Sequence, residues 1–321
     1  MSFFKDLNVG YKAGDKTCYS GRITALKNQY WHQEMLVADI IDLENNKNTN
    51  IGIIGYVCDI GVQRNQGRIG AQKGPKSMRH KLGKLPIHFK NKKITDFGDI
   101  ICIDENLEDC QKALSKTIHK LITNGVLPIA IGGGHDIAYA NFNGIKEALK
   151  NVSKNKIGII NFDAHFDLRA VETQPNSGTP FHQILSEHTH VNYFAIGIQQ
   201  QANTKELFEI AAEKKVSYVS SLDCEAFDET LKSKLQNFIE NVDVLYITID
   251  LDGFSSAYAP GVSAPSTLGF TPNFVYKALD FLFQSKQVIS CDIAELNPDF
   301  DIDHRTAGLA AKLVDYIVQK A

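Results

Sequence analysis

Residues 157–167 decide the fold, and they read Ile157-Gly158-Ile159-Ile160-Asn161-Phe162-Asp163-Ala164-His165-Phe166-Asp167. The first half is apolar almost throughout, which is typical of a strand in a parallel sheet that is covered on both faces. The second half alternates three side chains of metal-binding type, Asp163, His165 and Asp167. Because ligands bind beyond the carboxyl ends of strands in such sheets, this stretch predicts both the architecture and the place of a site.

Similar apolar runs recur along the chain and alternate with amphipathic segments. The expected strands are residues 51–58, 127–131, 156–162, 193–198, 244–249 and 287–293. The expected helices, where apolar side chains recur at helical spacing, are residues 105–123, 204–215, 225–240, 273–284 and 305–319. This alternation predicts a three-layer α/β/α fold around a mainly parallel, doubly wound sheet.

No internal repeat and no linker rich in proline, glycine or serine divides the 321 residues. A single large α/β domain can reach this length, so we expect residues 1–321 to form one domain. The polar stretch 44–50 is interpreted as a surface loop before the first core strand, and residues 1–50 as an N-terminal extension packed on the domain.

Composition argues against several classes of protein. The formal net charge of -3, from 34 basic and 37 acidic residues, does not suit a nucleic-acid binder, which needs a basic surface for phosphates. No uninterrupted apolar stretch is long enough to span a membrane, and the N-terminus lacks the apolar region of a signal peptide. The six cysteines form no C-x-x-C pair and are interpreted as buried thiols of a reducing compartment. We therefore expect a cytoplasmic protein with neither nucleic acid nor membrane as partner.

Two other expected strands are followed by side chains of the same chemical kind. Gly132-Gly133-Gly134-His135-Asp136 follows the strand at 127–131, and Asp250-Leu251-Asp252 follows the strand at 244–249. Residues two apart on an extended backbone point to the same side, so Asp163, His165 and Asp167 can face one place if their segment stays extended, as can Asp250 and Asp252. The candidate ligands are His135, Asp163, His165, Asp167, Asp250 and Asp252.

Four carboxylates in one cleft repel one another and are costly to desolvate, and two divalent cations would compensate their charge. A set rich in oxygen, with two imidazoles and no thiolate, favours manganese over zinc. Each feature alone has a simpler explanation: His135 as a loop residue, Asp250 and Asp252 as helix caps. Their occurrence after three separate strands favours a binuclear metal site.

The segments at 132–136, 161–167 and 248–252 resemble the metal signatures of the arginase/agmatinase/formimidoylglutamase (ureohydrolase) family. Further matching motifs lie at 61–71 with Gly74-Pro75, at 259–261 and at 294–298, so the resemblance runs in order from about residue 51 to the C-terminus. It implies an arginase-like fold and a hydrolase that cleaves a carbon–nitrogen bond of a small amidine or guanidine. It also implies two Mn²⁺ per subunit and a homotrimer or homohexamer.

The resemblance also implies roles for individual residues. One metal would be bound by His135, Asp163, Asp167 and Asp250, and the other by His165, Asp163, Asp250 and Asp252. Asp163 and Asp250 would then bridge the two metals. Glu295 matches the glutamate that holds the substrate's planar cation, with a plain strand-end salt bridge as the alternative. Asp167 would act as a catalytic residue that passes a proton to the leaving nitrogen.

Three features favour the formimidoylglutamase branch of the family. Arg169 stands where the arginase-like pattern has a small polar residue, and an arginine suits a substrate with more carboxylate, although it could also form a structural salt bridge. Ser177 stands where agmatinases usually have histidine, and Gly261-Val262-Ser263-Ala264-Pro265 differs from the Gly-Thr-Gly-Thr-Pro common elsewhere. We expect substrate contacts from Arg169 and Ser177. Arg64 and Arg68 are further candidates.

The expected reaction is hydrolysis of N-formimidoyl-L-glutamate to formamide and L-glutamate, a step of histidine degradation. The alternative is arginase or another guanidine hydrolase that releases urea, with the same metals and a different tail pocket. A zinc deacetylase of similar fold and a metal-binding scaffold with an inactive site are further candidates, and the complete set of six ligands argues against both. His182 is interpreted as a surface loop residue rather than a proton shuttle.

Overall fold

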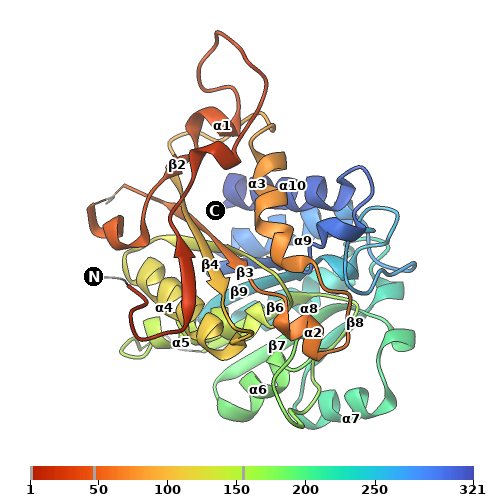
Figure 1. Ribbon diagram of the computed structural model, residues 1–321. Coiled ribbons are helices and arrows are strands. Elements are labelled where there is room, and N and C mark those ends of the chain that lie inside the picture. The colour runs from red at the N-terminus through yellow and green to blue at the C-terminus, as the bar shows by residue number, and fades with distance from the viewer. Residues whose placement is uncertain (1–2, 46–47, 154–155) are drawn as a thin grey trace.

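A mainly parallel sheet crosses the middle of the molecule and carries helices on both faces (Figure 1). This computed structural model describes residues 3–45, 48–153 and 156–321. Met1 and Ser2, in the segment considered for a signal peptide, and Asn46 and Lys47, in the expected surface loop, lie outside the described residues.

Within the described ranges, ten strands form one sheet in the order β1-β4-β3-β5-β10-β9-β6-β7-β8, with β2 beside β4. The strands are β1 (Val9–Lys12), β2 (Leu36–Val37), β3 (Ile51–Val57), β4 (Ile94–Cys102), β5 (Leu127–Ile131), β6 (Ile157–Phe162), β7 (Val191–Ile198), β8 (Ser217–Ser220), β9 (Val244–Asp250) and β10 (Val288–Ala294). Strand β1 runs antiparallel to β4, and the other pairings are parallel. The predicted doubly wound sheet is therefore confirmed.

Helices cover the two faces of this sheet as separate layers. One layer holds α4 (Leu107–Thr123), α5 (Ile137–Ala148), α6 (Pro180–Glu187) and α7 (Lys205–Glu213), and the other holds α3 (Gly74–Leu82), α8 (Glu229–Glu240), α9 (Pro272–Gln284) and α10 (Arg305–Lys320). The short helices α1 (Trp31–Glu34) and α2 (Ile60–Arg64) lie outside these layers (Figure 1).

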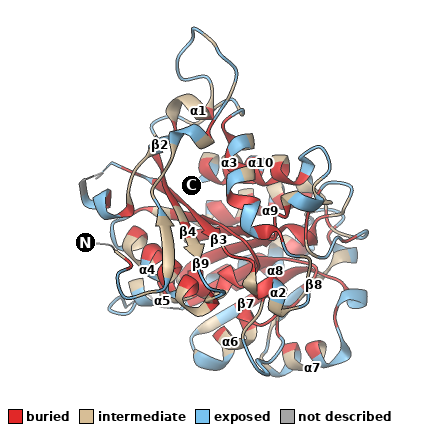
Figure 2. Cartoon of the chain, viewed as in Figure 1, coloured by how far each residue is buried: buried red, intermediate tan, exposed pale blue. Residues whose placement is uncertain are grey.

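The buried side chains form two apolar clusters, one on each face of the sheet. Alternate residues of a strand point to opposite faces, so Ile51 and Ile53 join one cluster while Ile54 and Tyr56 join the other. Figure 2 shows the buried strands in the centre and the exposed outer sides of the helices. This explains why the strands are apolar throughout rather than alternating.

The expected strands all occur, and each boundary lies within two residues of the expected position. The five expected helices also occur, although α8 begins at Glu229 rather than at 225. Strand β4 had not been expected, because Thr95, Asp96 and Asp99 interrupt its apolar residues. Its Asp96 is buried, where it pairs with Arg79 and accepts a hydrogen bond from Tyr19. A strand whose buried carboxylate is paired from distant segments has no apolar signature.

The N-terminal residues are tied to the rest of the chain by strands and by buried aromatic side chains. Strand β1 pairs with β4, and the buried Trp31 donates its indole N–H to Asp315 of α10 at 2.7 Å. The division of the chain into one domain with an N-terminal extension stays a prediction.

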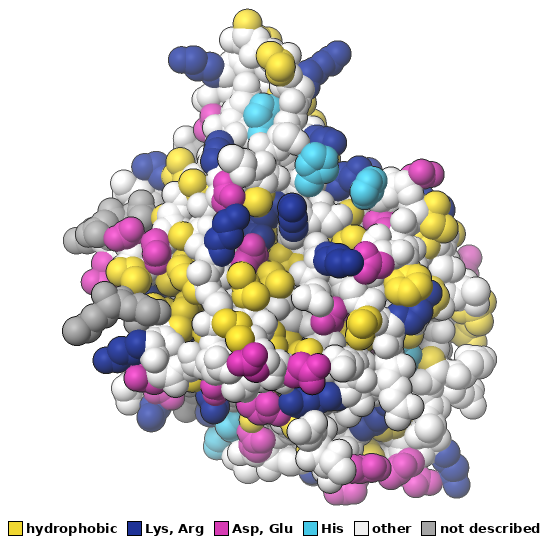
Figure 3. All heavy atoms as spheres, viewed as in Figure 1, with side chains coloured by type: hydrophobic (Ala, Val, Ile, Leu, Met, Phe, Trp, Pro, Cys, Tyr) yellow, Lys and Arg dark blue, Asp and Glu magenta, His cyan; other side chains and the backbone are white. Residues whose placement is uncertain are grey.

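Two surface properties bear on possible partners. In the part of the chain that is described, no helix combines the length and apolar character that crossing a membrane requires. Basic and acidic side chains are intermixed on the face drawn in Figure 3, as the near balance of charge leads one to expect.

Candidate metal centre

Four adjacent strands bring the candidate ligands to one edge of the sheet. The strand order β5-β10-β9-β6 places Ile131, Ile293, Ile249 and Phe162 side by side in register. All six candidate ligands and Glu295 follow this row within five residues along their own strands. Residues from 135 to 295 therefore meet because of strand pairing, at the edge where doubly wound sheets bind ligands.

The first group of side chains surrounds His135. Its Nδ1 atom lies 2.8 Å from Asp167, 3.1 Å from Asp163 and 3.2 Å from Asp250, measured to the nearest carboxylate oxygen. These four residues can offer ligand atoms within 4.8 Å of one another. They are the four residues assigned above to one metal.

The second group surrounds His165, whose Nδ1 lies 3.2 Å from Asp252 and 3.4 Å from Asp163. Asp163 belongs to both groups, and it directs Oδ2 toward His135 and Oδ1 toward His165. This is the arrangement of a bridging carboxylate. Asp250 is absent from the second group, and its Oδ1 accepts the backbone N–H of Asp252 at 2.8 Å.

The backbone that carries these ligands is extended only in part, since Asp250 ends strand β9 whereas the segment after β6 does not stay extended. The chain bends at Ala164 and His165, and Asp167 adopts a left-handed conformation with φ of 48°. Asp252 lies in a 3-10 turn, Leu251–Gly253, directly after β9. Glu295 also has a positive φ of 68°. Left-handed backbone is uncommon for residues other than glycine, and here it aims two site carboxylates.

The acidic cluster is electrostatically unfavourable without a cation. Burial, and then the charge of Asp163, raise the pKa of Asp167 to about 6. Burial, and then the charge of Asp250, raise the pKa of Asp252 well above its usual range. Burial alone would lower the pKa of His135, but its hydrogen bonds to the surrounding carboxylates raise it well above the ordinary value. In the absence of metal, protons therefore balance the charge of the cluster.

The donor set fits two divalent cations. Two buried carboxylate oxygens, Asp252 Oδ1 and Glu295 Oε2, have no hydrogen-bond partner among the described residues. Unpartnered carboxylate oxygens in a buried acidic cleft are costly, and a cation satisfies them. Carboxylate oxygens and imidazole nitrogens without thiolate suit manganese.

A buried polar chain fixes the orientation of His135 from behind. Its Nε2 atom lies 3.0 Å from the hydroxyl of Thr248, which in turn donates to Asp292 at 2.6 Å. Tyr246 and Asn141 also donate to Asp292. Because the Thr248 hydroxyl gives its proton to Asp292, it accepts from Nε2–H, and Nδ1 is left free to bind a metal.

Glu295 is anchored by one oxygen and free at the other. Its Oε1 accepts the backbone N–H of His135 at 3.0 Å, while its Oε2 is the unpartnered atom. Glu295 also lines a cavity of about 320 Å³ that contains both metal-binding groups. The free oxygen is thus available to a planar cation bound in that cavity.

Three of the four candidate substrate contacts line this cavity, namely Arg68, Arg169 and Ser177. Asn65 connects two of them, since it accepts from Arg169 and donates to Ser177 at 3.0 Å. The guanidinium of Arg68 is bound to the backbone carbonyls of Val262 and Ser263 and lies 4.0 Å above the ring of Phe300. Arg169 is exposed and is therefore the arginine whose charge is most open to a substrate.

Two residues considered from the sequence, Arg64 and His182, do not line the cavity. Arg64 does not line it, because its guanidinium pairs with Glu108 at 2.7 Å and donates to the carbonyl of Pro175. Its expected contact with substrate stays a prediction. His182 lies in helix α6 rather than in a loop, and it too is absent from the cavity lining.

No role in the site was predicted from the sequence for Asn65, Thr248 or Asp292. Asn65 and Thr248 lie within the quoted motifs at 61–71 and 248–252, so their motif membership was a usable signal. Asp292 lies inside an apolar strand, where a buried carboxylate is unusual enough to indicate a partner.

Comparison with known proteins agrees with this arrangement. A family model described as "Arginase family" matches residues 49–319. The formimidoylglutamase of Geobacillus sp. (strain WCH70) is 40% identical over 308 residues, which cover 94% of each chain. The formimidoylglutamase of Macrococcus caseolyticus (strain JCSC5402) is 38% identical and covers 97% of this chain and 98% of the relative.

Solved structures share the fold. The formimidoylglutamase of Bacillus subtilis subsp. subtilis str. 168 matches with a TM-score of 0.77 and 22% identity over 85% of this chain and 87% of that chain. The Trypanosoma cruzi formiminoglutamase, solved with Mn²⁺, matches with a TM-score of 0.77 and 24% identity over 88% of this chain and 98% of that chain. Arginase from Bacillus subtilis matches with a TM-score of 0.69 and 23% identity over 84% of this chain and 98% of that chain. At these identities the likeness establishes the fold.

Replacing Thr248 by valine should weaken manganese binding about 10- to 100-fold, because the ring of His135 loses the acceptor that fixes its tautomer. Thr248→Ser keeps the hydroxyl and should bind manganese as the wild type does. Calorimetric titration of the metal-free proteins measures both affinities. Equal affinity in Thr248→Val and wild type would contradict a role for Thr248 in orienting His135.

Manganese should stabilise the protein more as the pH rises through about 6. Without metal, the raised pKa values mean that the folded cluster holds protons which the unfolded chain releases. For Asp167 this stabilisation is present below its ordinary pKa of 3.8 and is lost as the pH rises through about 6, and for the two histidines it is lost above 6.5. Manganese must displace those protons, so it binds more tightly at higher pH.

The measurement is the Tm difference between manganese-loaded and metal-free protein across this pH range. The difference should widen with pH, and one that is constant or narrows would refute the proton competition. Asp315→Asn, which alters a half-buried carboxyl outside the centre, should leave the pH trend unchanged.

Proposed function

The chain belongs to the arginase family, and from that premise we propose that it hydrolyses N-formimidoyl-L-glutamate to formamide and L-glutamate, a step of histidine degradation. The observation that carries this proposal is the coincidence of two features. One is a buried cluster of two imidazoles and four carboxylates, and the other is nearly full-length similarity to formimidoylglutamases. The enzyme is thus a metal-dependent hydrolase that acts on a linear amidine.

The proposed ligands form two overlapping sets. His135, Asp163, Asp167 and Asp250 bind one Mn²⁺, and His165, Asp163, Asp250 and Asp252 bind the other. Support comes from the two groups of neighbouring ligand atoms and from the two-sided position of Asp163. Divalent cations held by these residues would supply hydroxide near neutral pH, because they would lower the pKa of water.

Glu295 orients the substrate for attack on its amidine carbon. Its Oε1 is held by the His135 backbone, so the carboxylate cannot rotate freely, and Oε2 accepts an N–H of the formimidoyl group. Such a fixed acceptor stabilises the positive charge on the amidinium and holds the planar carbon in one position.

Asp167 transfers a proton to the leaving nitrogen. Its carboxyl lines the cavity, so it can take up a proton from the attacking water and pass it on. Water adds to the amidine carbon, the bond from that carbon to the glutamate nitrogen breaks, and Asp167 returns a proton to that nitrogen. The atoms of one water molecule are thereby divided between formamide and L-glutamate.

The tail of the substrate lies toward Arg169 and Ser177. N-formimidoyl-L-glutamate carries two carboxylates, whereas arginine carries one carboxylate and an ammonium group. Arg169, oriented by Asn65, offers a charged donor at the cavity, and Ser177 lies at the other end of the same hydrogen-bonded chain. Arg68 lines the cavity wall, and two of its guanidinium nitrogens donate to backbone carbonyls.

We also propose the setting in which the enzyme works. The chain acts as a single catalytic domain and assembles into a homotrimer or homohexamer, as the family resemblance implies. The six cysteines are free, which agrees with a reducing cytoplasm.

Manganese-loaded protein should turn over N-formimidoyl-L-glutamate with a kcat/KM at least about 100-fold higher than for L-arginine or agmatine, because buried polar groups reject a substrate that leaves them unpaired. Release of formamide and L-glutamate is measured beside release of urea. Faster urea release from L-arginine would establish the alternative, a guanidine hydrolase. Asp163→Asn should lose manganese binding and all three activities.

Replacing Arg169 by serine should raise the KM for N-formimidoyl-L-glutamate about 10- to 100-fold with little change in kcat, since one charge-assisted hydrogen bond to the substrate tail is lost. Steady-state kinetics with Arg169→Lys, which keeps the charge, should show a smaller effect. Arg22→Ser removes an exposed arginine that does not line the cavity and should leave KM unchanged. An unchanged KM in Arg169→Ser would remove Arg169 from the substrate site.

A further inference from the structure

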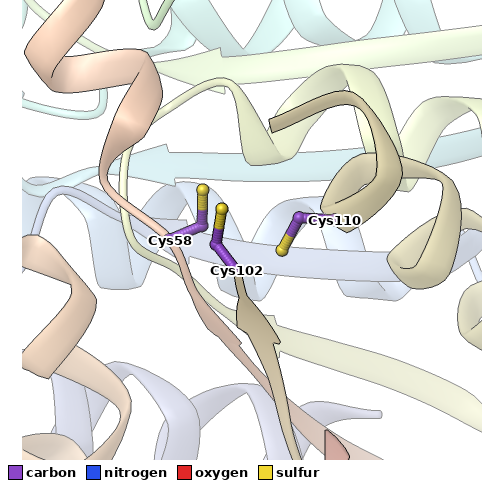
Figure 4. Close-up of side chains that lie close together, drawn as sticks. All are labelled: Cys58, Cys102 and Cys110. Carbon is purple, nitrogen blue, oxygen red and sulfur yellow. The ribbon is translucent and has the colours of Figure 1, made fainter. Parts of the chain in front are cut away.

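Three cysteines far apart in the sequence gather at one point outside the metal centre. Cys58, Cys102 and Cys110 can each offer a sulfur ligand, and their Sγ atoms lie within 4.8 Å of one another (Figure 4). Cys58 and Cys110 are buried and Cys102 is half-buried, so not every cysteine is the fully buried thiol expected from the sequence. Within the described residues, this is the group of three potential metal ligands that contains no residue of the manganese centre.

The fold itself brings the thiols together. Val57 pairs with Ile101 in the parallel strands β3 and β4, so Cys58 and Cys102 come next on neighbouring strands. Cys110 lies near the start of α4, which follows β4 after a short connection and packs back against it. The three sulfurs are thus held by three different elements, and no spacing in the sequence indicates the cluster.

We propose that Cys58, Cys102 and Cys110 form a binding site for one thiophilic cation of the Zn²⁺ or Cu⁺ class. For a metal–sulfur distance of about 2.3 Å, tetrahedral geometry places the ligand sulfurs about 3.8 Å apart. The sulfurs here lie within 4.8 Å of one another, so small side-chain movements suffice to close them around an ion. Thiolate ligands select such soft cations over manganese.

The charges around the cluster favour a bound cation. Hydrogen bonds from the thiols of Cys110 and Cys58, together with the nearby Arg64 guanidinium, lower the pKa of Cys102 to about 4. Burial, and then the hydrogen bond donated to Cys102, raise the pKa of Cys110, and the hydrogen bond to Cys102 also raises that of Cys58. Binding of one cation would replace these two thiol protons.

The site has an entrance and a dry interior. Cys58 and Cys110 belong to an apolar cluster, and the partly exposed Cys102 packs at its edge. An ion can therefore enter beside Cys102 while the other two sulfurs shield it from water. The three thiols leave the fourth position of a tetrahedral ion open to an exogenous ligand.

The proposed thiolate site lies directly behind one wall of the catalytic cavity. The carbonyl of Cys58 accepts the backbone N–H of Gly134 at 3.1 Å, next to His135. Helix α2 begins two residues after Cys58 and leads to Asn65, which lines the cavity. A cation at the cluster would fix the base of this wall without sharing a ligand with the manganese centre.

Cadmium is a suitable probe because cadmium bound to thiolate gives an ultraviolet charge-transfer band that carboxylate and imidazole ligands do not produce. The reduced, manganese-loaded protein is titrated with Cd²⁺. We expect the band to saturate at one equivalent, with a rise in Tm as the ion links β3, β4 and α4. Absence of the band would overturn the site, whatever substrate the enzyme uses.

Cys102→Ser should abolish the band, and its half-buried position allows serine without loss of the fold. Cys110→Ala is the second variant and should also abolish it. Cys18→Ser removes a half-buried cysteine outside the cluster and should leave the band intact. A band that persists in Cys102→Ser and Cys110→Ala would refute the proposal. Loss of two titratable thiols on isolation, with no band after reduction, would identify a disulfide pair instead.

Discussion

Mutual repulsion among carboxylates buried at one edge of the sheet is the constraint on which the rest of this structure depends. Asp163, Asp167, Asp250 and Asp252 come from two strand ends and cannot all be charged there without positive charge beside them. The fold supplies two imidazoles and leaves carboxylate oxygens without protein partners. The site is therefore incomplete without cations, which compensate its charge and also supply its chemistry.

Holding such a cluster requires rigid support, and the register of four parallel strands provides it. The aligned residues at the ends of β5, β10, β9 and β6 set the starting point of each ligand segment. Behind them, Thr248 and Asp292 lock the ring of His135, and the His135 backbone in turn locks Glu295. The same short segment thus positions a metal ligand and the acceptor for the substrate, which couples metal geometry to substrate geometry.

The sequence predicted most of this because strands buried on both faces are apolar and because ligands follow strands directly. It failed where a residue's state depends on a distant partner. Strand β4 was missed because Asp96, which pairs with Arg79, interrupts its apolar run, and the ion pair of Arg64 with Glu108 was not predicted. The bend at Ala164 and the left-handed backbone of Asp167 were missed because alternation in sequence does not require an extended chain. In these cases the local structure was determined by contacts across the fold rather than by residue type.

Ligand softness distinguishes the acidic cluster at the sheet edge from the proposed cysteine site. The catalytic edge presents carboxylate and imidazole, which suit manganese, while the back of the same wall presents three sulfurs, which suit a thiophilic ion. Cys58 belongs to the sulfur cluster, yet its carbonyl holds the glycine turn that carries His135. Any change at the sulfurs that moved the Cys58 backbone would therefore move the start of the first ligand segment. The difference in ligand chemistry would direct different cations to the two clusters, and the hydrogen bond from Gly134 to Cys58 joins the backbone segments that carry them.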